Sequence, residues 1–291
     1  MNEDPFDEDE LRRWFERHFP GSSDRFRGMK DALRRSNGDV DAAFDELRKA
    51  GLSEERKRGT VHRSGGIATA FSADSRVGAI VLLTCQTDFV ARGDSFRALL
   101  AELARLVLEH APRDVEALGA LEHPTSGVTV REAVERLGRE TGEELTLAAC
   151  ERFSNATGRV GGYVHHDGKK GALVSVTTGA DEVQANAFLK LLSMHVVSAW
   201  PTPIVVTRDE ITPAVIERER GVLLELPDLK GKPAELQEKI LKGRMEKFFA
   251  ERVLSEQPWM LDDKLTVQKA VEAALGKGAK IDGFARFQIG K

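Results

Sequence analysis

The chain has 291 residues, about twice the common size of one domain, so two or three folding units are expected. The 43 basic and 47 acidic residues leave a net charge of −4, which argues against a general nucleic-acid binder, because such proteins need surplus Lys and Arg to displace phosphate counterions. No run approaches the roughly 18 apolar residues of a membrane span. Six carboxylates among the first ten residues have the wrong sign for a targeting peptide. We therefore expect a cytoplasmic protein with no membrane contact.

The first fifty residues predict a bundle of three short helices. An apolar stripe marks the first helix, which ends at Pro20-Gly21. A second helix follows, and Asn37-Gly38-Asp39 breaks the chain before a third, which stops at Gly51. Residues 1–52 would have a very small core, as is typical of a docking module. The charged, Gly/Ser-rich residues 53–66 lack an apolar period and are interpreted as a linker.

From residue 67 the pattern changes to strands followed by helices. The predicted elements are strands over 67–71 and 77–85, a helix over about 95–110, a shorter helix around 130–137 and a strand over 144–153. Ser72-Ala73-Asp74-Ser75 separates the first two strands and predicts a hairpin turn. The long helix carries apolar residues from Phe96 to Val107 at the spacing of one helical face. Residues 67–153 therefore predict a first α+β subdomain.

The second half repeats this design in the same order. Gly78-Ala79-Ile80-Val81 and Gly171-Ala172-Leu173-Val174 are strand segments 93 positions apart. Phe96-Arg97-Ala98-Leu99-Leu100 and Phe188-Leu189-Lys190-Leu191-Leu192 are helix segments 92 positions apart. Two matches at nearly the same offset, with strand before helix in both, indicate an internal duplication. We therefore predict a second, related α+β subdomain over residues 154–291.

A helical hairpin is predicted inside the second subdomain, at about 213–255. Thr212-Pro213 begins its first helix, with threonine as the cap and proline in the first turn. A turn rich in proline and glycine, residues 227–233, leads to a second amphipathic helix that ends near Val253. The chain closes on a strand over 283–289, which we expect to pair back into the second subdomain.

The composition excludes most catalytic and metal-binding classes. Cys85 and Cys150 are far apart and lack a CxxC partner, which argues against a disulfide framework or a structural zinc. His165 and His166 are adjacent, and on a strand they would point to opposite faces, so they would not bind one metal together. Phosphate-loop, dinucleotide-binding and hydrolase motifs are missing. We expect no cofactor, no metal and no catalytic residues.

The loop between the buried second strand and the long helix, residues 86–94, is the most informative segment. Its Phe89 and Val90 are apolar among polar neighbours. In one interpretation both side chains fold back under the first turn of the helix, which Asp94 caps. In the other, Phe89 is an exposed aromatic presented to a partner, where its burial would add about 2 kcal/mol of binding free energy. Periodicity favours the first interpretation and leaves the second open.

At this loop the sequence resembles a known family. Cys85-Gln86-Thr87-Asp88-Phe89-Val90-Ala91 is similar to the signature of elongation factor Ts, which releases GDP from elongation factor Tu. Further segments are similar to family motifs, in family order: Asn37-Gly38-Asp39, Thr141-Gly142-Glu143-Glu144-Leu145, Tyr163-Val164-His165, Met194-His195-Val196, Gly243-Arg244-Met245, Glu256-Gln257-Pro258 and Gly283-Phe284. The chain departs from the family at Ala148-Ala149, where two arginines are usual, and at Thr141, which replaces an isoleucine.

The resemblance implies a complete α+β architecture. It consists of a three-helix, ubiquitin-associated-like bundle (1–52), a linker (53–66), a core N-subdomain (67–153) and a core C-subdomain (154–291), with small antiparallel sheets and an inserted hairpin. The resemblance also implies a non-catalytic exchange factor that binds elongation factor Tu in its GDP-bound and nucleotide-free forms, without direct nucleic-acid contact. The bundle would rest on the GTP-binding domain of Tu. The hairpin would contact another part of Tu, and a homodimer through the hairpin stays open.

The resemblance further implies six partner-binding residues. They are Thr87, Asp88, Phe89 and Val90 of the signature, Gly142 of the neighbouring loop and His165 of the second subdomain. Asp88 and Phe89 would insert between two helices of the GTP-binding domain and disturb the magnesium ion and the phosphate-binding loop that hold GDP. A factor that binds nucleotide-free Tu more tightly than GDP-bound Tu must weaken GDP binding by the same ratio.

Other interpretations stay open beside the resemblance. The fold could persist without exchange activity, in a divergent paralogue that binds Tu or another GTPase as a scaffold. A ubiquitin-associated-like bundle on an unrelated enzyme is a third alternative, although no catalytic cluster supports it. Taken alone, His165 is better explained as a half-exposed strand residue than as a partner contact, and its family position makes the two interpretations about equal. His195, beside Met194 on a helix, is interpreted as a packed or hydrogen-bonded core residue. Cys85 is expected to be a small core hydrophobe, and Trp259 to cover the base of the hairpin.

Overall fold

The computed structural model describes residues 64–229 and 232–289, so the predicted N-terminal bundle and most of the predicted linker lie outside the described residues. Within this range the chain forms two compact units. The larger comprises residues 64–210 and 250–289, and the smaller comprises 211–229 and 232–249. The larger unit is a mixed α/β structure with small antiparallel sheets, as predicted. The division of this unit at residue 153 stays a prediction.

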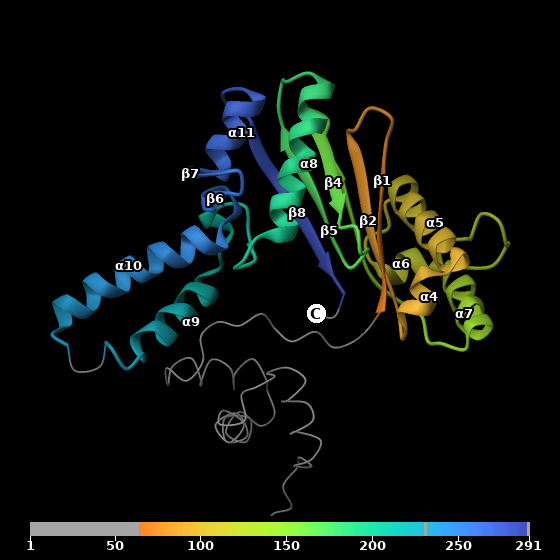
Figure 1. The fold of residues 1–291 in the computed structure, drawn as a ribbon, viewed down its shortest axis with the longest axis horizontal. Helices are drawn as coiled ribbons and strands as arrows, with labels where there is room; N and C mark the ends of the chain where they lie inside the picture. Colours follow the sequence, from red (N-terminus) through yellow and green to blue (C-terminus); the bar gives the residue numbers. More distant parts are fainter. Residues whose placement is uncertain (1–63, 230–231, 290–291) are drawn as a thin grey trace, which may run out of the picture. The chain divides into compact units, whose positions relative to one another are not determined.

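The first sheet contains three antiparallel strands in the order β1-β2-β3 (Figure 1). The strands are β1 (Ser64–Phe71), β2 (Val77–Cys85) and β3 (Thr146–Ser154). The central strand β2 is buried from Gly78 onwards, which explains its continuous apolar run. β1 begins three residues before the predicted start because Gly65 packs against β2, where a Cβ atom would lie 2.3 Å from the Leu83 carbonyl oxygen. The glycine that suggested a linker is required by strand packing.

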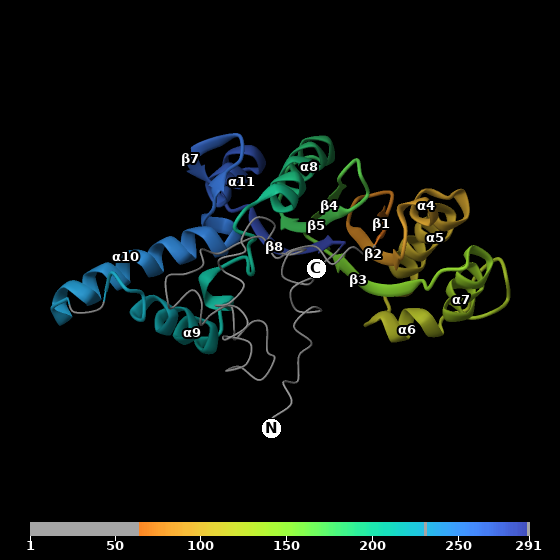
Figure 2. The same ribbon diagram turned by 60° about the horizontal axis from the view of Figure 1, so that its bottom comes forward.

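Helices cover the outer face of this sheet. They are α4 (Asp88–Arg92), α5 (Asp94–His110), α6 (Val115–Ala120) and α7 (Val130–Thr141). Helix α5 packs on β1 and β2 through the predicted apolar face, and α6 lies along β3 (Figure 2). The capping box that begins α7, formed by Thr129 and Glu132, fixes the start of the predicted shorter helix. Helices α4 and α6 were not predicted.

The second sheet follows the same order with β4 (Gly158–Val164), β5 (Lys170–Thr177) and β8 (Lys280–Gln288). Helix α8 (Glu182–Ser198) covers β4 and β5, and the closing strand β8 pairs with β5, as predicted. The segments that were not predicted are the small hairpin of β6 (Pro258–Trp259) and β7 (Asp262–Thr266), helix α11 (Val267–Leu275) and the 3-10 turns η1 (Arg208–Glu210) and η2 (Leu254–Glu256).

The inner faces of the two sheets pack against each other. This contact is formed by buried aliphatic side chains of the two sheets, namely Ile67, Ile80, Leu82, Val160 and Leu173, together with Ile289 directly after β8. With α5 outside the first sheet and α8 outside the second, the larger unit has four layers in the order helix, sheet, sheet, helix. The matched sequence segments lie on the central strands β2 and β5 and on the helices α5 and α8, as the internal duplication predicts.

His195 and Trp259 of the second half both lie in the core. His195 lies in the core as predicted, with its Nε2 3.1 Å from Oε1 of Gln257. Trp259 is also buried, and its ring stacks on Phe188 at a centroid distance of 5.5 Å and on His195 at 5.3 Å. The β6–β7 turn thus directs the indole into the core beside α8, and the covering of the hairpin base stays a prediction.

The smaller unit contains the two predicted helices of the hairpin, α9 (Pro213–Leu224) and the main part of α10 (Ala234–Arg252). Pro213 occupies the first turn of α9, as expected. Phe248 and Phe249 of α10 are partly buried and meet edge to face at 5.6 Å. In the range covered by the structure, none of the helices is both long and apolar enough to cross a membrane.

Candidate partner-binding site

The predicted contact loop contains a short helix of its own, α4. Thr87 caps this helix, since its hydroxyl oxygen accepts a 3.4 Å hydrogen bond from the Val90 N–H. Gly93 then adopts an extended conformation (φ −64°, ψ 144°) and separates α4 from α5. A helix of five residues is unstable alone, so contacts with the rest of the fold must hold α4 in place.

Phe89 and Val90 have opposite environments although they are adjacent. Val90 is 6% exposed and packs in the core under α5, whereas Phe89 is 88% exposed. The first interpretation of this loop is therefore wrong for Phe89. Successive helical residues point about 100° apart, and in α4 this separation leaves Phe89 in solvent while Val90 faces the core. Asp94 is also not the cap, because Gly93 occupies that position and Asp94 is the first helical residue.

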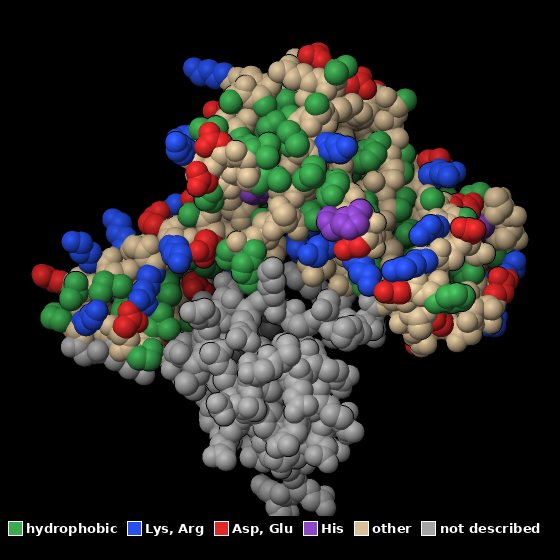
Figure 3. Space-filling model, in the orientation of Figure 1, with side chains coloured by type: hydrophobic (Ala, Val, Ile, Leu, Met, Phe, Trp, Pro, Cys, Tyr) green, Lys and Arg blue, Asp and Glu red, His purple; other side chains and the backbone are tan. Residues whose placement is uncertain are grey.

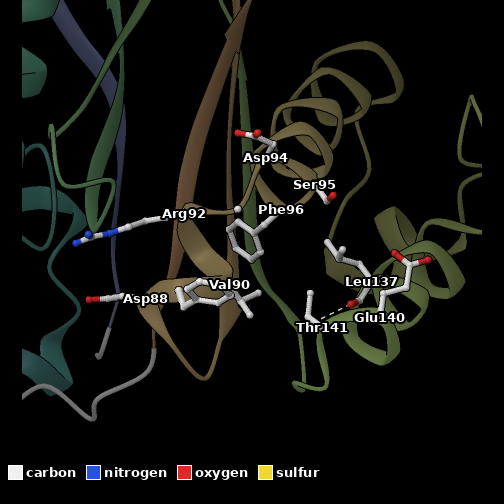
Figure 4. Close-up of a pocket in the computed structure, with 11 residues that line it drawn as sticks. Asp88, Val90, Arg92, Asp94, Ser95, Phe96, Leu137, Glu140 and Thr141 are labelled. Atoms are coloured by element: carbon white, nitrogen blue, oxygen red, sulfur yellow. Dashed lines mark hydrogen bonds between the residues drawn. The ribbon is translucent and has the colours of Figure 1, made fainter.

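A hollow of about 930 Å³ lies beside α4. It runs between α4, the first turn of α5 and the C-terminal turn of α7, and it is lined by Asp88, Phe89, Val90, Arg92, Gly93, Asp94, Ser95, Phe96, Leu137, Glu140 and Thr141. Figure 4 shows Phe96 and Leu137 facing this space, with the Thr141 hydroxyl bonded to the Leu137 carbonyl at 2.8 Å. The exposed ring of Phe89 thus stands at the rim of a hollow with an apolar floor.

Glu143 connects the loop that contains Gly142 to the contact loop. Gly142 ends α7 in the left-handed conformation (φ 72°), which places Glu143 opposite the end of β2. The Glu143 carboxylate accepts hydrogen bonds from the N–H groups of Gln86 (2.9 Å) and Thr87 (3.0 Å) and from the Thr87 hydroxyl. Partial burial alone would raise the pKa of Glu143, but these donors together lower the pKa below its usual value.

Asp88 connects α4 to the second sheet. Its carboxylate accepts a hydrogen bond from the Ser64 hydroxyl of β1, and Lys169 Nζ lies 2.9 Å and 3.2 Å from its two oxygens. These partners, Ser64 first, lower the pKa of Asp88 below its usual value. Lys169 belongs to the turn between β4 and β5, where its backbone also accepts a bond from Ile289. The side chain predicted to contact a partner is therefore already paired within the chain.

His165 lies in the same β4–β5 turn, just past the end of β4. Its Nδ1 is 3.1 Å from Asp167 Oδ1, and its side chain is half-buried. The rings of His165 and His166 lie only 4.2 Å apart. The prediction that they point to opposite faces is wrong, because the strand ends at Val164 and the turn places both rings on one side. Histidine, acidic and basic side chains lie close together on this face in Figure 3.

The structure brings the six predicted residues together through side chains that were not predicted. Glu143 joins Thr87 to the loop of Gly142, and Lys169 joins Asp88 to the turn of His165. Spacing along the sequence contains no signal for these contacts. Among the described residues, no group of three or more His, Cys, Asp or Glu side chains is arranged to hold a metal ion.

Cys85, at the end of β2, is a buried free thiol, as expected. Burial, assisted by the nearby charges of Glu143 and Asp88, raises the pKa of this thiol to about 11. The thiol is therefore protonated at neutral pH and unreactive. Beside the proposed contact loop, Cys85 fills space in the core and supplies no chemistry.

A family model and several known relatives that match this chain share one name. The family model described as "Elongation factor TS" matches residues 86–291. Relatives named elongation factor Ts include that of Magnetococcus marinus, 34% identical over 265 residues, which cover 90% of this chain and 86% of the relative. The relative from Mesorhizobium japonicum is 35% identical over 276 residues (91% and 88%), and that from Symbiobacterium thermophilum is 37% identical over 272 residues (90% and 86%).

Proposed function

We propose that this chain releases GDP from its partner by inserting Phe89 of α4 into it. The chain belongs to the elongation factor Ts family and is thus a nucleotide exchange factor for elongation factor Tu in translation elongation. The observation that supports this mechanism is the 88% exposure of Phe89 beside the buried Val90. Burying the phenyl ring on a partner would contribute about 2 kcal/mol to the binding free energy.

The ordered backbone of α4 suits the proposed role of Phe89. Val90 anchors one face of α4 in the core, and Thr87 caps its first turn, so the backbone under the ring is already ordered before binding. A backbone segment that is already ordered loses less conformational entropy on association than a flexible loop does. More of the free energy of ring burial is then available to change the conformation of the partner.

Exchange follows from linkage between the two ligands of Tu. If the factor binds nucleotide-free Tu more tightly than GDP-bound Tu, its binding weakens GDP by the same ratio. In the proposed mechanism, Phe89 separates two helices of the GTP-binding domain, with Asp88 beside it. This displaces the magnesium ion and the phosphate-binding loop, which hold GDP through charge and backbone N–H groups. The factor breaks no covalent bond and needs no cofactor.

The remaining contacts complete the proposal. Thr87, Gly142 and His165 would border the same surface, which accepts both GDP-bound and nucleotide-free Tu. Val90, which was also predicted to contact the partner, is buried and would act as the anchor of α4 behind this surface. The N-terminal bundle, residues 1–52, would rest on the GTP-binding domain, and the hairpin would contact another part of Tu or a second copy of this chain. We place this activity in the cytoplasm, where translation takes place.

Release of fluorescent GDP from the cognate elongation factor Tu tests the proposal. The wild-type chain should accelerate release, and Phe89→Ala and Asp88→Ala should each lose most of the acceleration while remaining folded by circular dichroism. Binding without acceleration by the wild type would contradict the exchange mechanism and favour a scaffold. Equal rates for wild type and Phe89→Ala would contradict only the insertion of the ring.

A further inference from the structure

Glu143 occupies an unusual position for a partly exposed carboxylate. One of its oxygens accepts the N–H groups of Gln86 and Thr87, and the other accepts the Thr87 hydroxyl. Residues 86 and 87 are separated from Glu143 by more than fifty positions in the sequence. A single side chain therefore joins the end of β2 to the loop between α7 and β3. Hydrogen bonds to an ionised carboxylate are stronger than those between neutral groups.

The Thr87 hydroxyl connects Glu143 to α4. It donates to Glu143 and accepts from the Val90 N–H, so the cap of α4 and the Glu143 contact share one oxygen atom. Fixing the Thr87 hydroxyl also fixes the first turn of the five-residue helix that carries Phe89. The backbone of Glu143 is fixed in turn, because its N–H donates to the Gly138 carbonyl of α7 at 3.0 Å.

We propose that Glu143 is a positioning residue for nucleotide exchange: through Thr87 it holds α4 at a set orientation to the loop of Gly142, so that Phe89 meets the partner without prior ordering of the helix. This inference rests on the proposed function and extends it to a side chain behind the contact surface. Glu143 acts on the exchange rate through the orientation of Phe89 and makes no required contact with the partner.

Three substitutions separate this role from simpler ones. Glu143→Ala removes all three hydrogen bonds. Glu143→Gln removes the charge, but its amide oxygen can accept the two N–H groups and its NH₂ can donate to the Thr87 oxygen. Glu144→Gln is the matched control, because Glu144 is the exposed neighbour and this change removes the same charge from the same loop.

The experiment measures maximal GDP release from elongation factor Tu together with backbone amide hydrogen exchange in the free full-length chain. We expect Glu143→Ala to lower the maximal rate about fivefold, the factor that corresponds to one net hydrogen bond. The amides of Gln86, Thr87 and Val90 should exchange faster. Glu143→Gln should recover most of the rate, and Glu144→Gln should match the wild type. If Glu143→Ala does not fold, Thr87→Val removes the same link from the other side.

A double variant tests whether Glu143 acts through Phe89. In the Phe89→Ala background, Glu143→Ala should cause no further loss, because the ring that it orients is gone. If Glu143→Ala lowered the rate of GDP release about as much in the Phe89→Ala background as in the wild type, the proposal would be overturned in favour of a direct charge contact with the partner. A Glu143→Gln rate as low as that of Glu143→Ala would have the same meaning. A wild-type rate in Glu143→Ala despite faster amide exchange would overturn it as well. If the wild type released no GDP, the proposed function would fail, and faster amide exchange would still establish the structural link.

Discussion

The two halves of the larger unit use an equivalent stretch of chain differently. Residues 86–93 follow β2, and the helix offset of 92 aligns them with 178–185 after β5. In the first half this stretch forms a separate helix, α4, which ends at Gly93 and exposes Phe89. In the second half Asp181 caps α8, which continues without a break. The duplicated framework thus permits one segment to diverge, and the proposed contact lies in that segment.

One aligned pair of residues accounts for much of this difference. Gly93 aligns with Ala185, which is fully buried inside α8. Alanine favours the helix interior more than any other residue, and glycine is less favourable by about 1 kcal/mol. A continuous helix is therefore expected where alanine stands, and a break where glycine stands. A single small residue can decide whether an aromatic side chain is presented to solvent.

The strongest test of the shared framework concerns two glycines at the repeat offset of 93. A Cβ atom at Gly65 would lie 2.3 Å from the Leu83 carbonyl oxygen, and one at Gly158 would lie 2.0 Å from that of Val176. We expect Gly65→Ala and Gly158→Ala each to lower the unfolding free energy by about 3 kcal/mol, measured by urea denaturation. Gly179→Ala, where the new methyl group meets nothing within 4 Å, is the control. Destabilisation by only one of the first two would show that the halves are not equivalent.

The next prediction tests the divergent segment. Phe89→Ala should reduce GDP release about thirtyfold, the factor that corresponds to about 2 kcal/mol of lost ring burial. The melting temperature should stay the same, because the ring is exposed in the free protein. Val183→Ala is the matched control, since Val183 is 81% exposed in the aligned segment of the second half. Equal loss of exchange in the two variants would remove the functional distinction between the halves.

Much of the framework could be predicted from the sequence because it depends on local patterns. The apolar run of β2 and the helical face of α5 repeat at regular spacing, and so did their counterparts in the second half. Helix α11 has the same kind of pattern, with apolar residues at 267, 270, 271, 274 and 275, and was readable in the same way. The separate helix α4 was not, because five residues are too few to establish a period.

The candidate site was predictable only in part, for a physical reason. The resemblance to a family located Phe89, but periodicity alone favoured its burial. The contacts of Glu143 with Thr87 and of Lys169 with Asp88 join residues 56 and 81 positions apart. Such contacts depend on how two loops meet in space, and neither residue type nor spacing indicates them. The side chains that orient the site are thus harder to predict than those that form its surface.

The pH dependence of stability should depend on His195 in the second half. Burial lowers the pKa of His195 in the second core, and the Gln257 hydrogen bond only partly opposes this. At low pH the unfolded chain therefore takes up a proton on His195 that the folded chain does not. The contribution of neutral His195 to the unfolding free energy is fully present above the ordinary histidine pKa of about 6.5, and it is lost as the pH falls below that value. Urea denaturation from pH 7.5 to 5 should show a smaller decline for His195→Gln than for wild type. His166→Gln, at an exposed site, is the control, and an unchanged decline in His195→Gln would contradict the assignment.

The smallest expected effect concerns the link between the halves, Lys169 with Asp88. Lys169→Met should raise the pKa of Asp88 towards its ordinary value, although the Ser64 hydroxyl stays in place. The pKa of Asp88 is lowered in the folded protein. The ionised carboxylate therefore contributes to the unfolding free energy above about pH 4, and this contribution is lost as the pH falls through the pKa of Asp88 in the folded protein. NMR titration of the Asp88 carboxyl measures the shift, with Lys170→Met as the control.

Exchange activity shows whether this link matters for function. Both partners are exposed, and exposed ion pairs contribute little, so Lys169→Met should change GDP release by less than about twofold. A loss as large as that of Phe89→Ala would instead mean that the second half holds α4 in its active orientation. The divergent segment would then depend on both halves of the duplicated framework. A small effect assigns the orientation of Phe89 to the first half alone, where Val90, Thr87 and Glu143 are sufficient.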